Sequence, residues 1–461
     1  MSTGLINLLP FDVEIQIDQK TTDRVVIKCT SLLREIVGKR HVYEGTWNGQ
    51  AVIVKVFDSF RGRLNSSREF HGFTVLQKRG ISSPRVLLKG QDHHGGAVLV
   101  LEKIPDGQDL TVFFKDCRDE QEKKEMYSRW INFAAAMNEK GIRQNDFHAG
   151  NFLLAKSGLF ALDAAQMKFS ARPLRQTASF IQLAMLYCSI PQQDLPDRKW
   201  VIETYCDARG WATSVKIQSQ FDQLITKAKA RANRRFLKKI MRSSRYTFFM
   251  RENGYSGIFL RDRWSEDGAR EFIQKIDRLM ESGQILKQGT TCFVSRVKVG
   301  ALNIVIKRYN HKGWIHSLRQ TLKGSRAKRN WQNGHRLQQY QIPTAAPAAY
   351  LELKKGPLVC QSYFVADFVD GPNLNEYLRS AVVTQADRRK TIGHIEQLLA
   401  ALKNNRMSHG DLKLTNILIH NNRPVLIDLD SVRKHACRWS LLFYAHKMTA
   451  SFQSHIKEYN T

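Results

Sequence analysis

Apolar and polar positions follow the same order of patterns in the two halves of the chain. Each half contains a β-branched run with a lysine near its end, AVIVKVF with Lys55 and NIVIKRY with Lys307, and such runs predict buried strands. A helical segment follows and ends in a short turn, at Pro84 in the first half and at Thr344 in the second. The pattern predicts one long internal repeat, not a solenoid of short ones.

The repeat continues through a strand, a turn and a helix. An apolar strand leads into an Asp-Gly pair, Asp106-Gly107 in the first half and Asp370-Gly371 in the second. Apolar residues then recur three or four positions apart, which predicts an amphipathic helix. These residues are Met126, Trp130, Phe133 and Met137 in the first half and Ile392, Ile395, Leu399 and Leu402 in the second.

A polar loop and two short apolar strands close each copy, RQNDFHAGNFLLAKSGLFALDAA and then SHGDLKLTNILIHNNRPVLIDLDS. Asp146, Asn151 and Asp163 stand 5 and 12 residues apart. A single Asp-x4-Asn carries no information, but two equal triads, each after a lysine strand and a helix, indicate a duplicated site. The second triad, with the same two spacings, is Asp411, Asn416 and Asp428.

The two copies predict two domains, residues 1–245 and 246–461. The boundary is placed in the basic, turn-rich stretch that follows Ser244. The first copy continues after Asp163 with about 80 residues that we predict to be helical, whereas only 33 residues follow Asp428. We therefore expect the second domain to have the shorter helical lobe.

The residue types in the triads suit phosphoryl transfer, which needs positioned phosphates, neutralised charge and an oriented acceptor. A strand lysine can hold phosphates, and Glu69 on the following helix can orient Lys55. The first loop aspartate can accept a proton from an acceptor hydroxyl. The asparagine and the later aspartate offer the oxygen ligands that Mg²⁺ prefers. The triads alone imply this reaction and no particular acceptor.

The loop HGDLKLTNILI and the strand LIDLDSV resemble the lipopolysaccharide core kinases of Gram-negative bacteria, the heptose and Kdo (3-deoxy-octulosonic acid) kinases of the protein-kinase-like superfamily. GIRQNDFHAGNFLL and FALDAAQMKF are similar to the heptose kinases. The resemblance implies an α+β fold of two tandem kinase-like domains, each with a small antiparallel β lobe and a mainly helical lobe. It also implies ATP and Mg²⁺ as cofactors and a sugar hydroxyl of the lipopolysaccharide core, or a lipid-linked sugar, as acceptor.

Carried over by position, the resemblance gives each candidate site residue a role. In the first copy Lys55 binds phosphates, Glu69 pairs with it, Asp146 is the catalytic base, and Asn151 and Asp163 bind the metal. In the second copy the phosphate, base and metal roles fall to Lys307, Asp411, Asn416 and Asp428.

The second copy departs from this pattern on its helix. Asn330 stands at the helix Glu position, and no Asp or Glu occurs from Lys307 to Leu351. The second copy either orients Lys307 differently or has lost activity. Its loop nevertheless resembles the family better, with His409 where the first copy has Gln144. Which copy is active stays open at this point.

Charge adds a hypothesis about partners. The 461 residues carry a formal net charge of +30, and two acid-free basic runs, 227–251 and 307–336, are candidate surfaces for the anionic inner membrane. Nucleic acid ranks lower, because no RRM, KH or helix-turn-helix signature is present. Seven scattered cysteines without a CxxC pair favour a reducing, cytoplasmic setting, with the protein on the cytoplasmic face of that membrane.

Three other functions fit the same residues. They are a protein Ser/Thr kinase, a small-molecule phosphotransferase and a pseudokinase scaffold that binds an anionic partner. Acceptor screening separates the first two from a sugar kinase, and absence of Mg²⁺-ATP binding and turnover would favour the third.

Overall fold

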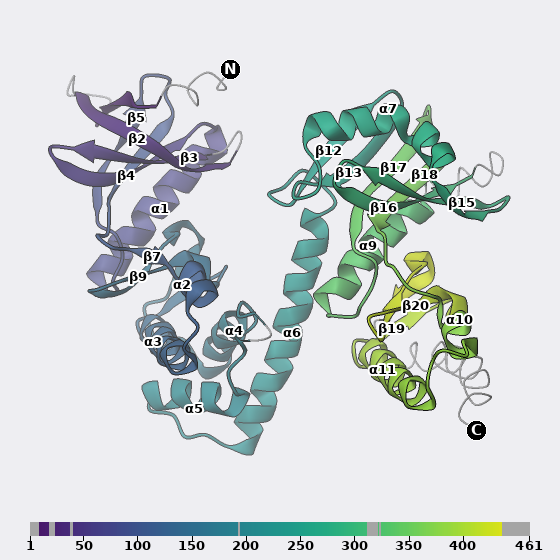
Figure 1. The fold of residues 1–461 in the computed structure, drawn as a ribbon. Helices are drawn as coiled ribbons and strands as arrows, with labels where there is room; N and C mark the ends of the chain where they lie inside the picture. Colours follow the sequence, from purple (N-terminus) through teal and green to yellow (C-terminus); the bar gives the residue numbers. More distant parts are fainter. Residues whose placement is uncertain are drawn as a thin grey trace. The chain divides into compact units, whose positions relative to one another are not determined.

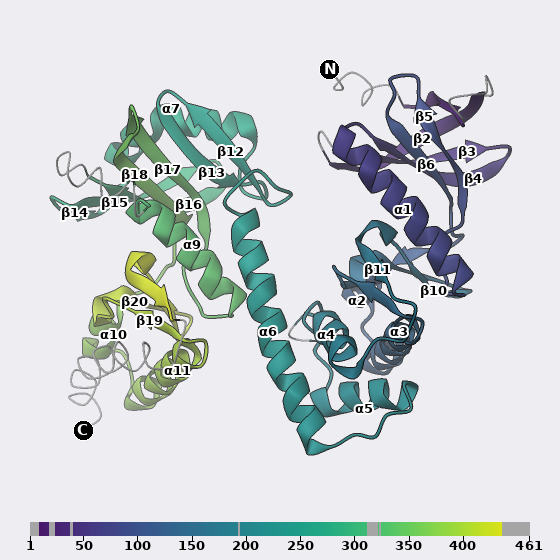
Figure 2. The same cartoon turned by 180° about the vertical axis from the view of Figure 1, so that it is seen from behind.

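The computed structural model describes residues 9–17, 24–36, 40–191, 194–310, 321 and 324–435. The chain divides into two compact units, Met1–Arg231 and Ala232–Thr461, each with its own β lobe and helical lobe (Figures 1 and 2). This confirms the predicted fold class of two tandem kinase-like domains. The domain boundary between residues 245 and 246 stays a prediction. The expected shorter helical lobe of the second domain also stays a prediction, because residues 436–461 lie outside the described residues.

The β lobe of the first unit is an antiparallel sheet that closes into a barrel, in the order β1-β2-β3-β4-β6-β5. Strand β4 carries Lys55 and lies between β3 and β6, so the lysine is held on a central strand. Buried residues from every strand fill the barrel, among them Ile15, Val54 and Val100. The strands are β1 (Phe11–Gln16), β2 (Arg24–Ile36), β3 (Arg40–Trp47), β4 (Gln50–Phe57), β5 (Val86–Asp92) and β6 (Ala97–Glu102).

Helix α1 (Phe60–Lys78) begins at Ser59, whose hydroxyl accepts a hydrogen bond from the Gly62 N–H. The helix packs on the β lobe and also on the turn η2 (Ala164–Gln166) of the helical lobe. The approach to η2 requires a glycine, because a Cβ at Gly72 would lie 2.6 Å from the Ala164 carbonyl oxygen. Helix α1 therefore lies directly beside the residue that precedes η2, Asp163.

The helical lobe of the first unit supports a set of short strands and turns. Its helices are α2 (Leu110–Asp116), α3 (Glu120–Glu139), α4 (Gln176–Tyr187), α5 (Arg198–Ala208) and the first part of α6 (Val215–Lys239), which continues past Arg231 into the second unit. The short elements are β7 (Gln108–Asp109), β8 (Ile142–Gln144), η1 (Ala149–Asn151), β9 (Phe152–Ala155), β10 (Gly158–Ala161) and β11 (Met167–Phe169). No helix among the described residues is both long and apolar enough to span a membrane.

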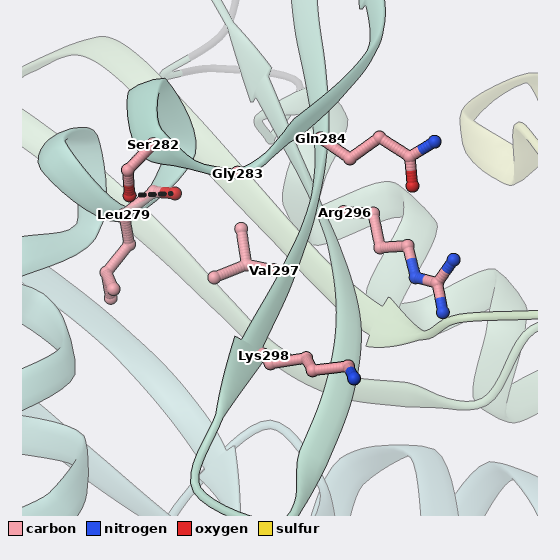
Figure 3. A pocket seen from close by; sticks show the side chains of 7 residues that line it. All are labelled: Leu279, Ser282, Gly283, Gln284, Arg296, Val297 and Lys298. Carbon is pink, nitrogen blue, oxygen red and sulfur yellow. Dashed lines mark hydrogen bonds between the residues drawn. The ribbon is translucent and has the colours of Figure 1, made fainter.

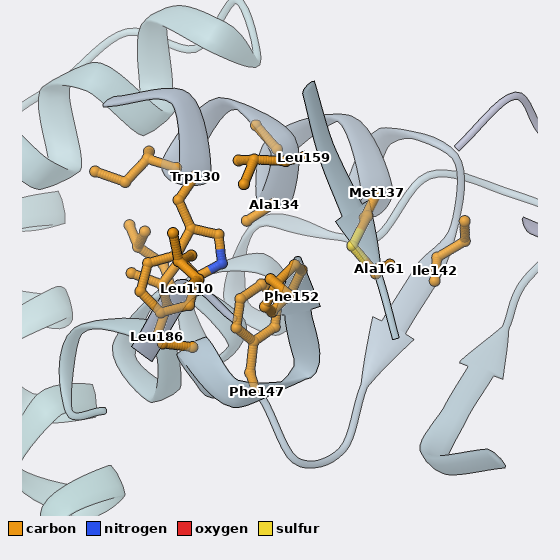
Figure 4. Close-up of a cluster of buried hydrophobic side chains, with 14 of the residues drawn as sticks. Leu110, Trp130, Ala134, Met137, Ile142, Phe147, Phe152, Leu159, Ala161 and Leu186 are labelled. Carbon is orange, nitrogen blue, oxygen red and sulfur yellow. The ribbon is translucent and has the colours of Figure 1, made fainter. Parts of the chain in front are cut away.

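Aromatic packing fixes the loop between β8 and β9. Phe147 and Phe152 lie against each other and against Trp130 of α3, with ring centroids 5.0 to 6.1 Å apart (Figure 4). All three side chains are buried. Because Phe147 follows Asp146 and Phe152 follows Asn151, this core anchors the backbone of both candidate site residues.

The second unit repeats this plan with a different sheet. Its β lobe is an open antiparallel sheet of seven strands in the order β12-β13-β17-β18-β16-β15-β14, and Lys307 lies on β16. Two helices, α7 (Glu266–Ser282) and α9 (Arg326–Gln339), contact the sheet. The strands are β12 (Thr247–Glu252), β13 (Tyr255–Leu260), β14 (Gln284–Gln288), β15 (Cys292–Val299), β16 (Leu302–Tyr309), β17 (Pro347–Lys355) and β18 (Leu358–Asp367).

The described part of the second helical lobe repeats the order of the first from α2 to β11, with an isolated bridge between Asn373 and Leu418 in place of β7. Helix α10 (Leu374–Arg379) and helix α11 (Gln385–Asn404) lead into the loop with the second triad. The short elements are β19 (Met407–His409), η4 (Leu414–Asn416), β20 (Ile417–His420), β21 (Arg423–Leu426), η5 (Leu429–Ser431) and β22 (Val432–Lys434). Helix α9 packs on η5 as α1 packs on η2.

Candidate active sites

In the first unit Lys55 of β4 and Glu69 of α1 form an ion pair. The Glu69 side chain is 0% exposed and also accepts a hydrogen bond from Arg40 of β3, with 3.4 Å between Nη1 and Oε2. A buried carboxylate is stable only when cations or donors surround it. The predicted pairing of Lys55 with Glu69 is therefore present, and Arg40 is a second cation that sequence reasoning missed.

The predicted base and metal residues of the first unit meet through backbone and side-chain hydrogen bonds. The Asn151 amide Nδ2 donates to the Asp146 carbonyl oxygen at 2.8 Å, and the Leu162 N–H donates to the Asn151 carbonyl oxygen at 2.8 Å. These contacts bring the two ends of the triad together and leave the Asn151 Oδ1 as a possible ligand. The Asp146 side chain is 54% exposed, with the His148 Nε2 3.5 Å from its Oδ2.

Asp163 has left-handed backbone geometry, with φ at +51°, and lies two residues after the end of β10. Burial, together with the Glu69 charge, raises the pKa of its carboxyl, while Lys55 and Arg40 act in the opposite direction. Among the described residues its carboxylate has no ion-pair partner. An added cation would stabilise the ionised form of such a partly buried carboxyl.

Asp163 and Asn151 together fit a divalent cation. They offer hard oxygen ligands, and Mg²⁺ commonly takes only one or two protein ligands and completes its shell with water and substrate phosphates. The described residues contain no cluster of three or more His, Cys, Asp or Glu able to hold a metal by themselves. The fit is therefore to a metal bound together with phosphate.

The triad of the second unit has the same local geometry. The Asn416 Nδ2 donates to the Asp411 carbonyl oxygen at 2.8 Å, and the Ile427 N–H donates to the Asn416 carbonyl oxygen at 3.0 Å. Asp428 again has a positive φ, +60°. The equal spacings in the sequence therefore correspond to equal folds of the two loops.

The partner of the strand lysine differs between the units. Lys307 Nζ donates to Asp428 Oδ1 at 2.5 Å, a contact across 121 positions of sequence. Burial would raise the pKa of the Asp428 carboxyl, but Lys307 and, more weakly, Arg326 outweigh burial and hold the pKa below its usual value. Lys307 is therefore oriented by Asp428 and not by a residue of α9, and the activity of the second copy stays a prediction.

Asn330 of α9, at the position of Glu69, is 1% exposed and fully engaged. Its Nδ2 donates to the Tyr309 Oη at 2.7 Å and to the Arg326 carbonyl oxygen at 3.0 Å. Its Oδ1 accepts the Leu429 N–H at 2.9 Å. Asn330 thus joins α9 to Leu429, the residue that follows Asp428. At the matching helix position of the first unit, Glu69 forms an ion pair with Lys55 instead.

Further contacts that sequence reasoning missed reinforce this junction. Arg326 pairs with Asp430 and lies over the Tyr309 ring, 4.6 Å from its centroid. Asn333 donates to the carbonyl oxygens of Leu429 and Val432 at 2.8 and 3.0 Å. The sequence offered one signal for these contacts, the helical spacing of the residues. Arg326 lies four positions before Asn330, about one helical turn, and Asn333 lies three positions after it.

The catalytic-loop residues that precede the two aspartates also differ. His409 is buried, and its Nε2 lies 3.1 Å from the Ile427 carbonyl oxygen. Gln144 at the same position is buried too, and its backbone N–H donates to the Gln182 Oε1 at 2.8 Å. In the second unit Asp411 pairs with Lys413, with 2.9 Å between Nζ and Oδ1.

The two basic runs differ in exposure. In run 227–251 every Lys and Arg except Lys229 is exposed, including Arg234, Lys238 and Lys239 of α6. In run 307–336 three of the described cations, Lys307, Arg308 and Arg326, pair with carboxylates of their own unit, and none of the described Lys and Arg is classed as exposed. Residues 311–320, 322 and 323 of this run, with Trp314, lie outside the described residues.

A pocket of about 420 Å³ opens in the second unit between the end of α7 and strands β14 and β15. Figure 3 shows Val297 pointing toward Leu279 of α7, whereas Arg296 and Lys298 point to the other side of β15. None of the predicted site residues is among the residues that line it. The candidate sites are therefore defined by side-chain geometry and not by this pocket.

Comparison with known proteins supports the assignment of the two copies. The model of the lipopolysaccharide kinase (Kdo/WaaP) family matches residues 28–201 and 270–441, one segment in each unit, which confirms the resemblance. A kinase family implies use of ATP, as a rule with a divalent metal. The solved structure entitled "Structure of vaccinia related kinase 3" is similar at 14% identity and a TM-score of 0.32, covering 49% of this chain and 86% of that chain. That TM-score is too low to support an argument.

Proposed function

Because the chain belongs to the lipopolysaccharide kinase (Kdo/WaaP) family, a family of kinase-like phosphotransferases, we propose that it phosphorylates a sugar hydroxyl of the lipopolysaccharide core. The acceptor is a hydroxyl of heptose or Kdo, the donor is ATP, and the metal is Mg²⁺. The reaction takes place in the first unit. The second unit contributes binding, with Lys307, Asp411, Asn416 and Asp428 at the matching positions.

One observation supports the choice of the first unit: Lys55 pairs with Glu69, and the partly buried carboxylate of Asp163 has no ion-pair partner among the described residues. Glu69 fixes the Lys55 ammonium so that it can bind donor phosphates. Asp163 and the Asn151 Oδ1 are then available to a metal. When bound, Mg²⁺ supplies charge neutralisation for the transferred phosphoryl group.

Asp146 serves as the base in this proposal. Its half-exposed carboxylate accepts the proton of the acceptor hydroxyl, and its backbone is fixed by Asn151 and by the aromatic core beneath the loop. His148, 3.5 Å away, orients that carboxylate. An exposed base suits an acceptor that is presented on a large lipid-linked sugar.

Acceptor transfer tests the function. Full-length protein is incubated with labelled ATP, Mg²⁺ and unphosphorylated lipopolysaccharide core, in parallel with a generic protein substrate and free sugars. We expect label in the core, and EDTA should abolish it. Label only in the protein or in the free sugars would replace this proposal with a protein kinase or a small-molecule phosphotransferase.

The exposed cations of run 227–251 support a location on the cytoplasmic face of the inner membrane, where anionic lipid and the acceptor are found together. Each Lys or Arg near an anionic surface contributes about 1 kcal/mol of attraction. Binding to vesicles that contain anionic lipid should therefore weaken with added salt. Equal binding to neutral vesicles would remove the membrane from the proposal.

A further inference from the structure

The charges around the two candidate sites balance differently. In the first unit two cations, Arg40 and Lys55, share the single carboxylate of Glu69, and Asp163 has no ion-pair partner among the described residues. In the second unit each carboxylate of the site has its own cation. The pairs are Lys307 with Asp428, Arg326 with Asp430, and Lys413 with Asp411.

The helix residue explains the difference. Glu69 offers a carboxylate to the strand lysine, whereas Asn330 offers only an amide whose donor and acceptor atoms are already used within the unit. Helix α9 contains no acid at all. The ammonium of Lys307 therefore has one close carboxylate, that of Asp428, and lies 2.5 Å from it.

A divalent cation at Asp428 would have to share the carboxylate with this ammonium, binding Oδ2 while Lys307 keeps Oδ1. Lys307 would then lie beside a dication without an acidic residue on α9 to receive it, and like charges at such distances repel strongly. In the first unit, binding of a divalent cation at Asp163 disturbs no ion pair of that aspartate, because Lys55 stays paired with Glu69. The donor set of the second unit therefore does not fit a divalent cation as that of the first unit does.

We propose that the second unit binds a nucleoside triphosphate without a divalent cation, with the Lys307 ammonium in the place of the metal. An ammonium has three N–H donors, so Lys307 can keep Asp428 as a partner and also donate to a phosphate oxygen. Arg326 lies close enough to interact electrostatically with Asp428 and adds positive charge beside this site. The inference rests on the proposed function only in expecting metal-dependent nucleotide binding at the first unit.

Equilibrium binding of a labelled, non-hydrolysable ATP analogue to the full chain tests this. We expect two molecules per chain with Mg²⁺ and one per chain in EDTA. Lys307→Met should abolish the EDTA-resistant binding, and Lys55→Met should leave it. Loss of all binding in EDTA, or loss of the resistant site in Lys55→Met instead of Lys307→Met, would overturn the proposal.

A substitution on α9 tests whether a carboxylate on this helix makes nucleotide binding at the second site depend on Mg²⁺. Asn330→Glu gives Lys307 a carboxylate on the helix and frees Asp428, so the second site should lose at least about tenfold in affinity when Mg²⁺ is withdrawn. Asn330→Gln is the matched control without the charge and should keep its affinity in EDTA. Equal responses of the two variants would contradict the role given to Lys307, and thermal unfolding of each checks that it folds.

The test of the metal-free nucleotide site and the test of the proposed transferase function can fail independently. If no label reaches the lipopolysaccharide core but one EDTA-resistant, Lys307-dependent site is found, the metal-free site stands and the transferase assignment fails. If transfer occurs and both nucleotide sites need Mg²⁺, the transferase assignment stands and the metal-free site is rejected.

Discussion

The loops that carry the two triads have the same local fold in the two units, but the ion pairs around them differ. In both, an asparagine donates to the loop aspartate's carbonyl oxygen at 2.8 Å, and the later aspartate has a left-handed backbone. In the first unit the strand lysine pairs with helix residue Glu69, and in the second it pairs with Asp428. The partner of the strand lysine thus differs with the helix residue, Glu69 or Asn330, and among the described residues only the later aspartate of the second unit is in an ion pair.

The comparison also shows two ways to attach a helix to the turn that follows the later aspartate. In the first unit a glycine lets α1 approach η2, and a buried ion pair links the helix to the sheet. In the second unit Asn330 and Asn333 bond directly to the backbone of Leu429 and Val432. The second attachment does not depend on the state of Lys307, so that lysine is available to Asp428.

Glu69→Gln should have the largest effect, because it removes the helix carboxylate that distinguishes the first unit from the second. It leaves Lys55 and Arg40 beside a neutral amide in a buried site, and loss of one partner of a buried ion pair costs about 3–5 kcal/mol. Misplacement of Lys55 should also lower phosphoryl transfer by about 10²-fold. Urea unfolding and the transfer assay measure the two effects. The matched control is Glu396→Gln on the exposed face of α11, where little change is expected.

Asn330→Leu should weaken the second unit less. The substitution removes the acceptor of the buried Leu429 N–H, and an unsatisfied buried donor costs about 1–3 kcal/mol. Hydrogen exchange of a peptide that contains Leu429 should quicken by about tenfold or more, while the corresponding peptide around Ala164 keeps its rate. Unchanged exchange at Leu429 would mean that the asparagine does not hold this turn.

Neutralising the two later aspartates should change stability in opposite directions. The pKa of Asp163 is raised, so its ionisation costs stability as the pH rises from the usual Asp range through the raised pKa, and the cost persists at neutral pH. The pKa of Asp428 is lowered, so its contribution is present above the usual Asp pKa and is lost as the pH falls through the lowered value.

In metal-free buffer at pH 7, Asp163→Asn is therefore expected to stabilise the first unit and Asp428→Asn to destabilise the second, by on the order of 1 kcal/mol for each pKa unit. Native-state hydrogen exchange of β4 and of β16 measures the stability of the first and the second unit separately. A shift of the same sign in both would contradict the different charge states assigned to them.

The smallest expected effect concerns the two basic runs. Replacing Lys238 with Gln on the exposed part of α6 should lower affinity for anionic vesicles by about 1 kcal/mol, roughly fivefold. Arg308→Gln in the other run should lower it less, because Arg308 already pairs with Asp277 at 2.9 Å. Co-sedimentation at two salt concentrations compares the variants, and equal losses would remove the distinction between the runs.

Much of the fold and of the site could be predicted because the informative contacts are local. The spacing from Asp146 to Asn151 spans one loop, and the hairpin β9–β10 fixes the distance to Asp163, so equal spacings identified both loops. The strand lysines and Glu69 followed from strand and helix patterns in the same order. Counting along the repeat also identified Asn330.

The partner of Lys307 could not be read from the sequence. Asp428 lies 121 positions away, and its choice as partner depends on the missing helix acid and on the packing of α9 against η5. Arg40 and Arg326 were missed for a similar reason: Arg40 meets Glu69 only when α1 packs on the β lobe, and Arg326 meets Asp430 only when α9 packs on η5. Sequence patterns therefore identified the candidate site residues, while tertiary contacts determine which ion pairs they form.

The most direct test of the account is phosphoryl transfer to the lipopolysaccharide core by Asp146→Asn and Asp411→Asn variants of the full chain. The account predicts a loss of about 10²–10⁴-fold in Asp146→Asn, the range expected for removal of a general base, and a loss below about tenfold in Asp411→Asn. Transfer that survives in Asp146→Asn and disappears in Asp411→Asn would contradict it, because the working site would then lie in the second unit.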